Sequence, residues 1–298
     1  MIVNHVEGNI NCYSDLENVM KSANPDIVIH MAAQPLVRLS YNYPLETMQT
    51  NIMGTANVLE AALKCKKKPI VACITSDKCY ENLDTNTPFN EGDRLGGYDP
   101  YSASKGGAEL VAASFARSFY LKRNQSLLTL RGGNVIGGGD WSDDRIMTDI
   151  ITALAADKSP IIRNPTAIRP WQHVLDVLTG YLMAINYVGT QKKACFEQFN
   201  IGPLKQNEAT VGKLTQLACQ IWGDNIEPIF DNTNSIIHEA STLQLDVTKA
   251  VNILGLKPKY DFRTTLLKTL DWYREEILCK NMAIFTRQQI TNYFEEDN

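Results

Sequence analysis

The chain has 298 residues, of which 44% are hydrophobic and 21% are charged. These values are typical of a folded globular protein and exclude disordered and fibrous classes, and the length suits one large α/β unit or two domains. The formal net charge is −4, from 29 Lys and Arg against 33 Asp and Glu, which provides no basic surface for nucleic acid or anionic lipid.

Cysteine usage and hydropathy predict a cytoplasmic protein. No apolar run reaches the roughly 18 residues that a membrane helix needs, and the first residues lack the basic and apolar regions of a signal peptide. The seven cysteines are scattered without a Cys-x-x-Cys pair, and there are only four histidines. This usage indicates reduced thiols and no metal site. We therefore expect a cytoplasmic protein that binds neither nucleic acid nor membrane.

The first half of the chain alternates short apolar runs with helical stretches. The β-branched runs at 26–31, 69–75 and 126–130 predict buried parallel strands. Between them, apolar residues at helical spacing predict helices over 44–63 and 101–122. Strands that alternate with helices in this way indicate a parallel sheet of the α/β class.

The second half has shorter elements and longer polar loops. From residue 132 to 171 the chain is rich in Gly, Asp, Asn and Pro. The later pattern predicts helices near 145–156, 171–188, 211–222 and 263–278, and a strand at 196–201. We expect a nucleotide-binding domain over residues 1–135, to which residues 171–201 return, and a smaller substrate-binding domain over residues 136–298.

The tetrapeptide Thr75-Ser76-Asp77-Lys78 follows a predicted strand. It therefore lies at the carboxyl end of the sheet, where open α/β sheets bind ligands. Ser76 can hydrogen-bond a sugar hydroxyl, while Asp77 and Lys78 can form an acid/base pair. The alternative is a strand-end turn without catalytic function, because Ser and Asp favour such turns.

A tyrosine and a lysine open the helix that follows. Tyr101 and Lys105 are four residues apart and share one helical face. A free phenol has a pKa near 10 and is a poor base at neutral pH, but a neighbouring cation favours the phenolate. The pair is a candidate for proton abstraction; the alternative is an ordinary helix start with two surface side chains.

Longer motifs accompany these two. They are His30–Arg38 (HMAAQPLVR), Thr50–Thr55 (TNIMGT), Arg131–Trp141 (RGGNVIGGGDW), Arg169–His173 (RPWQH), His238–Ala240 (HEA) and Leu254–Pro258 (LGLKP). With the two shorter motifs, they give a sequence that resembles the extended short-chain dehydrogenase/reductase (NAD-dependent epimerase/dehydratase) family, in its CDP-glucose 4,6-dehydratase branch. The resemblance covers residues 7 to 275, and RGGNVIGGGDW followed by RPWQH is its most specific part.

The resemblance implies a Rossmann-like, doubly wound parallel sheet and NAD as cofactor. It implies dehydration of CDP-glucose to CDP-4-dehydro-6-deoxyglucose in deoxysugar biosynthesis of the lipopolysaccharide O-antigen type. Tyr101, helped by Lys105, would remove the C4 hydroxyl proton, Ser76 would orient that hydroxyl, and Asp77 would protonate the departing C6 hydroxyl. The base at C5 stays open, because Lys78 stands where the wider dehydratase family has glutamate.

The resemblance also implies two sets of binding residues. Those expected at the cofactor are His30, Ala32, Ala33, Gln34, Asn51, Thr75, Tyr101 and Lys105, with His30 supporting the cofactor loop. Those expected at the substrate are Asn134, Arg163, Arg169, Trp171 and His173. The arginines suit a pyrophosphate, because guanidinium groups bind phosphate oxygens in pairs. Alternatively, they are solvated surface charges, and Trp171 and His173 are packing residues between the domains.

The aligned motifs imply that the chain begins near the family's third strand, at about residues 3–8. The strand and Gly-rich turn that hold the pyrophosphate of NAD are then expected to be missing. Three alternatives remain besides the dehydratase: a nucleotide-sugar epimerase, a reductase, and a silent remnant that binds a partner or a nucleotide-sugar. The family's habit of pairing helices implies a homodimer.

Overall fold

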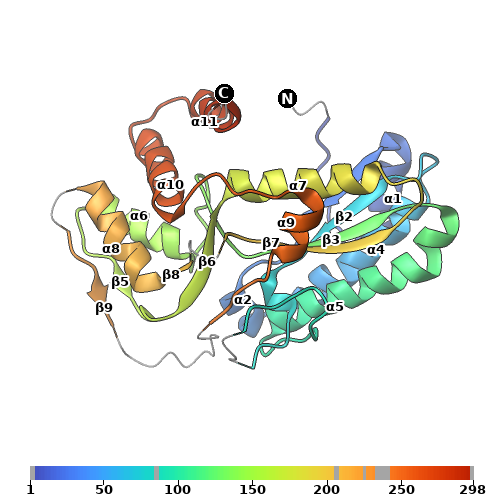
Figure 1. The fold of residues 1–298 in the computed structure, drawn as a ribbon, viewed down its shortest axis with the longest axis horizontal. Helices are drawn as coiled ribbons and strands as arrows, with labels where there is room; N and C mark the ends of the chain where they lie inside the picture. Colours follow the sequence, from blue (N-terminus) through green and yellow to red (C-terminus); the bar gives the residue numbers. More distant parts are fainter. Residues whose placement is uncertain (1–3, 84–86, 205–207, 224–225, 232–241, 296–298) are drawn as a thin grey trace.

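A four-stranded parallel sheet forms the centre of the first layer of the structure (Figure 1). The computed structural model describes residues 4–83, 87–204, 208–223, 226–231 and 242–295. The strands are hydrogen-bonded in the order β1 (Ile27–His30), β2 (Ile70–Ile74), β3 (Leu127–Gly132) and β7 (Phe196–Ile201). All three pairings are parallel. The α/β class and the positions of these four strands are confirmed, but the expectation that β1 is fully buried is wrong, because Ile27 and Ile29 are exposed.

Helical segments on one face of the sheet follow the predicted pattern. The segment 44–63 is helical throughout, as α3 (Pro44–Met48), the π-turn η1 (Gln49–Met53) and α4 (Gly54–Leu63). The next is α5 (Pro100–Phe115), extended by η3 (Ala116–Tyr120) and η4 (Leu121–Arg123). Helices α1 (Tyr13–Ala23) and α2 (Val37–Asn42) were not anticipated from the sequence. The apolar sides of α4 and α5 bury against β1, β2 and β3.

The other face is covered by α7 (Val174–Gly189), which runs along the sheet in Figure 1. Its buried side packs on β2, β3 and β7 in a second apolar cluster. The short helix α9 (Thr248–Leu254) joins this cluster through Ala250. Residues 174–201 thus belong to the first layer, and so does α9 from the later part of the chain. The division into two domains at residue 135 stays a proposal.

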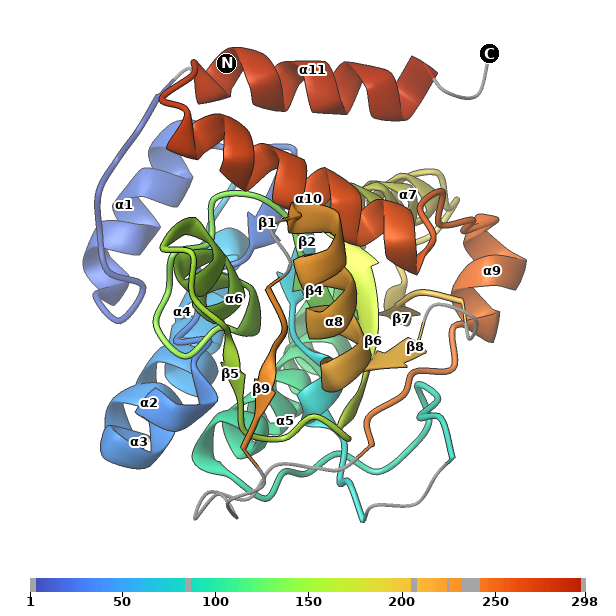
Figure 2. The same cartoon turned by 90° about the vertical axis from the view of Figure 1, so that its left-hand side faces the viewer.

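The second layer is built around strands that leave the first sheet at its carboxyl end. Strand β4 (Asn134–Ile136) pairs with β6 (Ile168–His173), which pairs with β8 (Glu208–Thr210). A two-stranded pair completes it, β5 (Ile161–Ile162) with β9 (Ile229–Phe230). Figure 2 looks onto this layer. Its helices are η2 (Asp77–Cys79) at the junction, and α6 (Ile146–Ala155), α8 (Val211–Trp222), α10 (Phe262–Ile277) and α11 (Met282–Glu295).

Two of the sequence predictions are wrong in this structure. The helix expected from residue 171 begins at Val174, because residues 168–173 are held in strand β6 by β4 and β8. The family's third strand, expected at residues 3–8, is not formed at residues 4–8, which are exposed and pair with no described strand. Residue 3 and the motif His238–Ala240 lie outside the described residues. Within the described part of the chain, no helix is long and apolar enough to cross a membrane.

Candidate active site

Two cavities meet at the carboxyl end of the first sheet. The acid–base cavity, about 430 Å³, is lined by Ser76, Asp77, Tyr101 and Tyr181 among others. The arginine cavity, about 270 Å³, is lined by side chains that include Arg38, Arg145, Arg163 and Arg169. The linings share Val37, Lys78, Asn134, Arg145, Ile146 and Trp171. The two cavities therefore adjoin, with Lys78 and Asn134 at their boundary.

The strand-end tetrapeptide places a carboxyl group inside the acid–base cavity. Ser76 caps the turn η2, its hydroxyl accepting a hydrogen bond from the backbone N–H of Lys78 at 3.2 Å and donating one to Asp77 Oδ1 at 3.0 Å. Asp77 is 2% exposed, and its Oδ2 has no hydrogen-bond partner among the described residues. Burial raises the pKa of Asp77, and Lys78 lowers it in part. A carboxyl group that holds its proton more tightly than usual suits a general acid.

Helix α5 presents Tyr101 and Lys105 from its first two turns. Asp99 caps the helix through the N–H of Ser102, and Pro100 occupies the first turn. Burial raises the pKa of Tyr101 to about 12, although a hydrogen bond to Ser76 lowers it in part. In the protein alone, loss of hydration is the largest influence on the phenol, so the activating role of Lys105 stays a prediction. Lys105 Nζ lies 6.0 Å from the centre of the Tyr101 ring, and burial lowers the pKa of Lys105 to about 8.

A buried hydrogen-bonded layer supports this site from the side of η1. Asn51 accepts a hydrogen bond from the backbone N–H of Gln34 at 2.8 Å and donates one to Ser104 on α5 at 2.8 Å. His30 Nε2 lies 3.0 Å from the hydroxyl of Thr55. That hydroxyl already donates to the carbonyl of Asn51, so His30 is the donor. Among the cofactor candidates, His30 and Asn51 thus face the protein interior.

The other cofactor candidates lie at different depths. Thr75 and Tyr101 line the acid–base cavity, whereas Lys105 lies buried beside it. Ala32 is exposed and Ala33 is half-buried, and neither lines a cavity.

The substrate candidates divide between cavity and core. Asn134, Arg163 and Arg169 line the arginine cavity. Arg163 is half-exposed and forms an ion pair with Asp144 at 3.6 Å, whereas Arg169 is 7% exposed. Trp171 touches both cavities but is 2% exposed.

Trp171 and His173 also have structural roles. The indole N–H of Trp171 donates to the Ala209 carbonyl at 3.0 Å. His173 lines neither cavity, and its Nδ1 accepts the backbone N–H of Leu175 at 3.2 Å, which caps α7.

The lining residues that sequence reasoning missed include Tyr181, Arg38 and Arg145. Tyr181 lines the acid–base cavity, Arg38 the arginine cavity, and Arg145 both. Arg38 and Arg145 form ion pairs with Asp144 and Asp140, at 3.5 and 3.8 Å. Clustered charges in the loop after residue 139 were an available signal for Arg145. Tyr181 sits on the apolar side of α7, so its pattern is that of a core residue.

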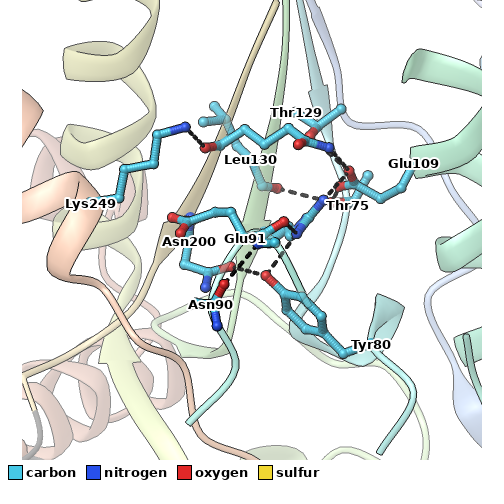
Figure 3. Close-up of polar contacts among 12 residues, drawn as sticks. Thr75, Tyr80, Asn90, Glu91, Glu109, Thr129, Leu130, Asn200 and Lys249 are labelled. Carbon is cyan, nitrogen blue, oxygen red and sulfur yellow. Dashed lines mark hydrogen bonds and ion pairs between the residues drawn. The ribbon is translucent and has the colours of Figure 1, made fainter. Parts of the chain in front are cut away.

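An ion pair ties α5 to the strands beneath the site. Arg131 donates to Glu109 Oε2 at 2.8 Å, and both side chains are at most 1% exposed. Glu109 also accepts the hydroxyl of Thr75 at 2.5 Å and that of Thr129 at 2.9 Å (Figure 3). Arg131 in turn donates to Tyr80 at 2.8 Å. Since Thr75 directly precedes Ser76 and Asp77, this network fixes the strand end that carries them against the helix that carries Tyr101.

Replacing Glu109 with Ala is expected to lower the free energy of unfolding by about 3–5 kcal/mol, because it leaves the charge of Arg131 buried without its carboxylate. The matched control is Glu60→Ala, which breaks the exposed pair with Lys64 and is expected to cost less than about 1 kcal/mol. Urea unfolding of the three proteins measures both. Equal losses for the two variants would contradict this view of the network.

Two buried histidines make stability depend on pH. Burial lowers the pKa of His30 and of His173 to about 4, against about 6.5 in an unfolded chain. The unfolded state therefore binds protons first, so stability is full above about pH 6.5 and is lost as the pH falls toward about 4. We expect a loss of roughly 3 kcal/mol per histidine, measured by urea unfolding across this range. His30→Gln is expected to remove about half of the dependence; a slope unchanged by this substitution would contradict the assignment to His30.

The chain was compared with protein families, curated proteins and solved structures. The family model described as "GDP-mannose 4,6 dehydratase" matches residues 2–269. A CDP-glucose 4,6-dehydratase of Salmonella typhimurium is 41% identical over 291 residues, which cover 96% of this chain and 81% of that protein. A dTDP-glucose 4,6-dehydratase of Streptomyces antibioticus is 29% identical, over 92% of this chain and 77% of that protein.

Solved structures agree on the fold. A UDP-glucose 4-epimerase of Thermotoga maritima, crystallised with UDP-glucose, is similar with a TM-score of 0.80 and 24% identity, over 91% of this chain and 84% of the other. A dTDP-glucose 4,6-dehydratase of Streptomyces venezuelae with NAD bound has a TM-score of 0.76 and 24% identity, over 91% and 79%. The resemblance to nucleotide-sugar dehydratases is confirmed by the family match and the 41% identity together. The chain belongs to the GDP-mannose 4,6 dehydratase family.

Proposed function

We propose that this protein is a CDP-glucose 4,6-dehydratase that acts with NAD and forms CDP-4-dehydro-6-deoxyglucose for deoxysugar biosynthesis. The observation that carries the proposal is the buried Asp77, whose Oδ2 has no described partner, beside Tyr101 in one cavity. An elimination of water needs an acid at the leaving hydroxyl in addition to the base at C4. Epimerisation at C4 needs only the base. The 41% identical relative of that name supports the choice of CDP-glucose.

The described residues fit the nicotinamide end of NAD. Tyr101 lines the cavity and Lys105 lies one helical turn further along α5, buried beside it. A hydroxyl and an ammonium in this arrangement suit the two ribose hydroxyls. Thr75 lines the same wall, and His30 and Asn51 hold the adjoining segment from behind. When bound, NAD supplies the oxidant that takes the hydride of C4 and later returns it to C6.

Tyr101 takes the proton of the C4 hydroxyl, which Ser76 orients. With its pKa near 12, Tyr101 rests as a phenol, so proton abstraction depends on cationic charge nearby. Lys105, with a pKa of about 8, is mostly protonated at neutral pH and supplies such a charge.

Asp77 then delivers its proton to the C6 hydroxyl as the C5 proton is lost to a base. Lys78 is our candidate for that base, since it borders both cavities. Overall, CDP-glucose is converted to CDP-4-dehydro-6-deoxyglucose and water, with no net oxidation.

The arginine cavity is the proposed site of the CDP group. Arg163 and Arg169 are our candidates to pair with pyrophosphate oxygens, because both line this cavity, and Asn134 lies at its boundary with the acid–base cavity. Trp171 and His173 we assign to packing around this site and not to direct binding, because both are 2% exposed and hydrogen-bonded within the protein.

We also propose a cytoplasmic homodimer. The seven cysteines are free, as in a reducing compartment. The outer faces of the helical segments over 44–63 and 100–123 expose large apolar side chains that a second copy would cover. These are Leu45, Met53, Leu110 and Phe119.

Turnover of nucleotide-sugars tests the function. The protein is incubated with NAD and, in parallel, CDP-glucose, UDP-glucose, dTDP-glucose or GDP-mannose, and the products are identified by mass and by the proton signal of a C6 methyl group. We expect loss of water and a new methyl signal with CDP-glucose. An isomer of unchanged mass would instead indicate an epimerase, and no reaction with any substrate would contradict the proposal.

A further inference from the structure

We propose that Tyr181 is a further ligand-binding residue of the acid–base cavity, whose hydroxyl hydrogen-bonds an oxygen of the molecule held there. The inference deepens the proposed function and rests on it for the identity of that molecule. Two sources offer such an oxygen, a hydroxyl of the sugar and the carboxamide of the nicotinamide.

The position of the ring is set by α7 and by the end of strand β3. Tyr181 lies on the buried side of α7 and packs in the apolar cluster with Leu130, Ala184 and Ile201. Its Oη lies only 2.5 Å from where a Cβ on Gly132 would stand. A side chain at residue 132 would therefore displace the hydroxyl, and the glycine is what lets it reach the cavity wall.

The Tyr181 hydroxyl has no hydrogen-bond partner in the part of the chain that the structure describes, although the residue is buried. Tyr181 is 6% exposed, and none of the described residues hydrogen-bonds its Oη. Four other buried tyrosines each donate their hydroxyl within the protein: Tyr80 to Asn200, Tyr120 to Leu59, Tyr273 to Asp140 and Tyr293 to Asp176. The Tyr181 oxygen is open to the cavity and is not enclosed by protein, so its hydrogen bond is available to a bound molecule. The contrast indicates that the partner of Tyr181 is the cavity's ligand.

The surroundings of Tyr181 determine the protonation state of its hydroxyl. It faces the same cavity as Asp77 and Tyr101, and burial together with these two groups raises the pKa of Tyr181. The residue therefore stays a neutral phenol that can donate. Asp77, whose Oδ2 also has no hydrogen-bond partner among the described residues, lines the same cavity.

The ring of Tyr181 contributes to the fold, whereas its hydroxyl is proposed to contribute to ligand binding. The ring fills space in an apolar cluster that phenylalanine would fill equally well. The hydroxyl adds nothing to that packing. Removing the hydroxyl should therefore leave the stability of the fold unchanged and weaken only binding in the cavity. At a structural tyrosine, removing the hydroxyl should lower stability and leave binding unchanged.

The experiment compares Tyr181→Phe with Tyr120→Phe in the full chain. Tyr120 is buried away from both cavities, and its hydroxyl donates to Leu59 O at 2.8 Å. For Tyr181→Phe we expect an unchanged or higher unfolding midpoint and about a tenfold loss of kcat/KM. For Tyr120→Phe we expect a lower midpoint with kcat/KM unchanged. The reverse pattern, or a Tyr181→Phe protein with unaltered kcat/KM and ligand affinities, would overturn the inference.

Calorimetric titrations distinguish the two sources of the oxygen. Weaker binding of NAD by Tyr181→Phe identifies the nicotinamide carboxamide, whereas a raised KM or weaker binding of CDP-glucose identifies the sugar. A loss confined to kcat places the contact in the reaction itself. If the parent protein binds these molecules without dehydrating CDP-glucose, the proposed function fails, while the titrations still decide the role of Tyr181.

Discussion

Tyr101→Phe is expected to abolish turnover of CDP-glucose while leaving the fold intact. The substitution removes a single oxygen, and general acid–base catalysis by a positioned side chain contributes about 10²–10⁴-fold. The ring stays buried at the start of α5, and the backbone N–H of Tyr101 keeps its hydrogen bond to Ser40. Steady-state kinetics measure the loss, and the unfolding midpoint reports the fold.

A tyrosine outside both cavities provides the control. Tyr187→Phe alters a ring that packs edge-on against Phe199, at 6.1 Å between centres. It should leave turnover unchanged, because Tyr187 lines neither cavity. Turnover by Tyr101→Phe within tenfold of the parent would show that another group takes the C4 proton.

Asp77→Asn is expected to block loss of water by about 10²–10⁴-fold while oxidation at C4 continues. The amide has nearly the same shape and its oxygen can still accept the hydrogen bond of Ser76, but it cannot deliver a proton to the departing hydroxyl. Reduced nicotinamide should then accumulate, because the first step proceeds and the hydride is not returned. Its absorbance after rapid mixing with CDP-glucose, together with product formation, measures the two steps separately.

Lys78 supplies the comparison at the neighbouring residue. If Lys78 removes the C5 proton, Lys78→Met should slow exchange of that proton with solvent deuterium, whereas Asp77→Asn should leave the exchange intact. Product formation at the parent rate in Asp77→Asn would remove Asp77 from the role of acid. Undiminished exchange in Lys78→Met would point to another base.

Local sequence pattern was sufficient for the elements that position the proposed chemistry. Continuous apolar runs mark strands buried on both faces, which is why β2 and β3 were predictable. The β-branched run of β1 marked a strand as well, although only one of its faces is buried. Since parallel strands share their carboxyl ends, the residues after β2 had to meet the start of α5 at one edge. The proximity of Ser76, Asp77 and Tyr101 follows from that topology.

The pattern of apolar residues could not predict the boundary between a strand and the helix after it where the strand's hydrogen-bond partners lie far along the chain. Residues 171–173 read as the start of a helix, yet they form the end of β6 because β4 and β8 hydrogen-bond them. The sequence pattern of Tyr181 is that of a core residue, because its ring is in the core. Its hydroxyl reaches a cavity only because Gly132, which is distant in sequence, lies close to it.

The α/β class, the family and the residues that meet at the carboxyl edge of the sheet were all predictable from the order of the residues. How those residues are charged and held became clear only from the folded chain. Sequence spacing predicted that Lys105 lies near Tyr101, but it could not show that burial raises the pKa of the phenol and lowers that of the lysine. The pairing of Glu109 with Arg131 was equally unseen, because the two are 22 residues apart. Hydration and ion pairing depend on every element packed around a group, and no local pattern contains that information.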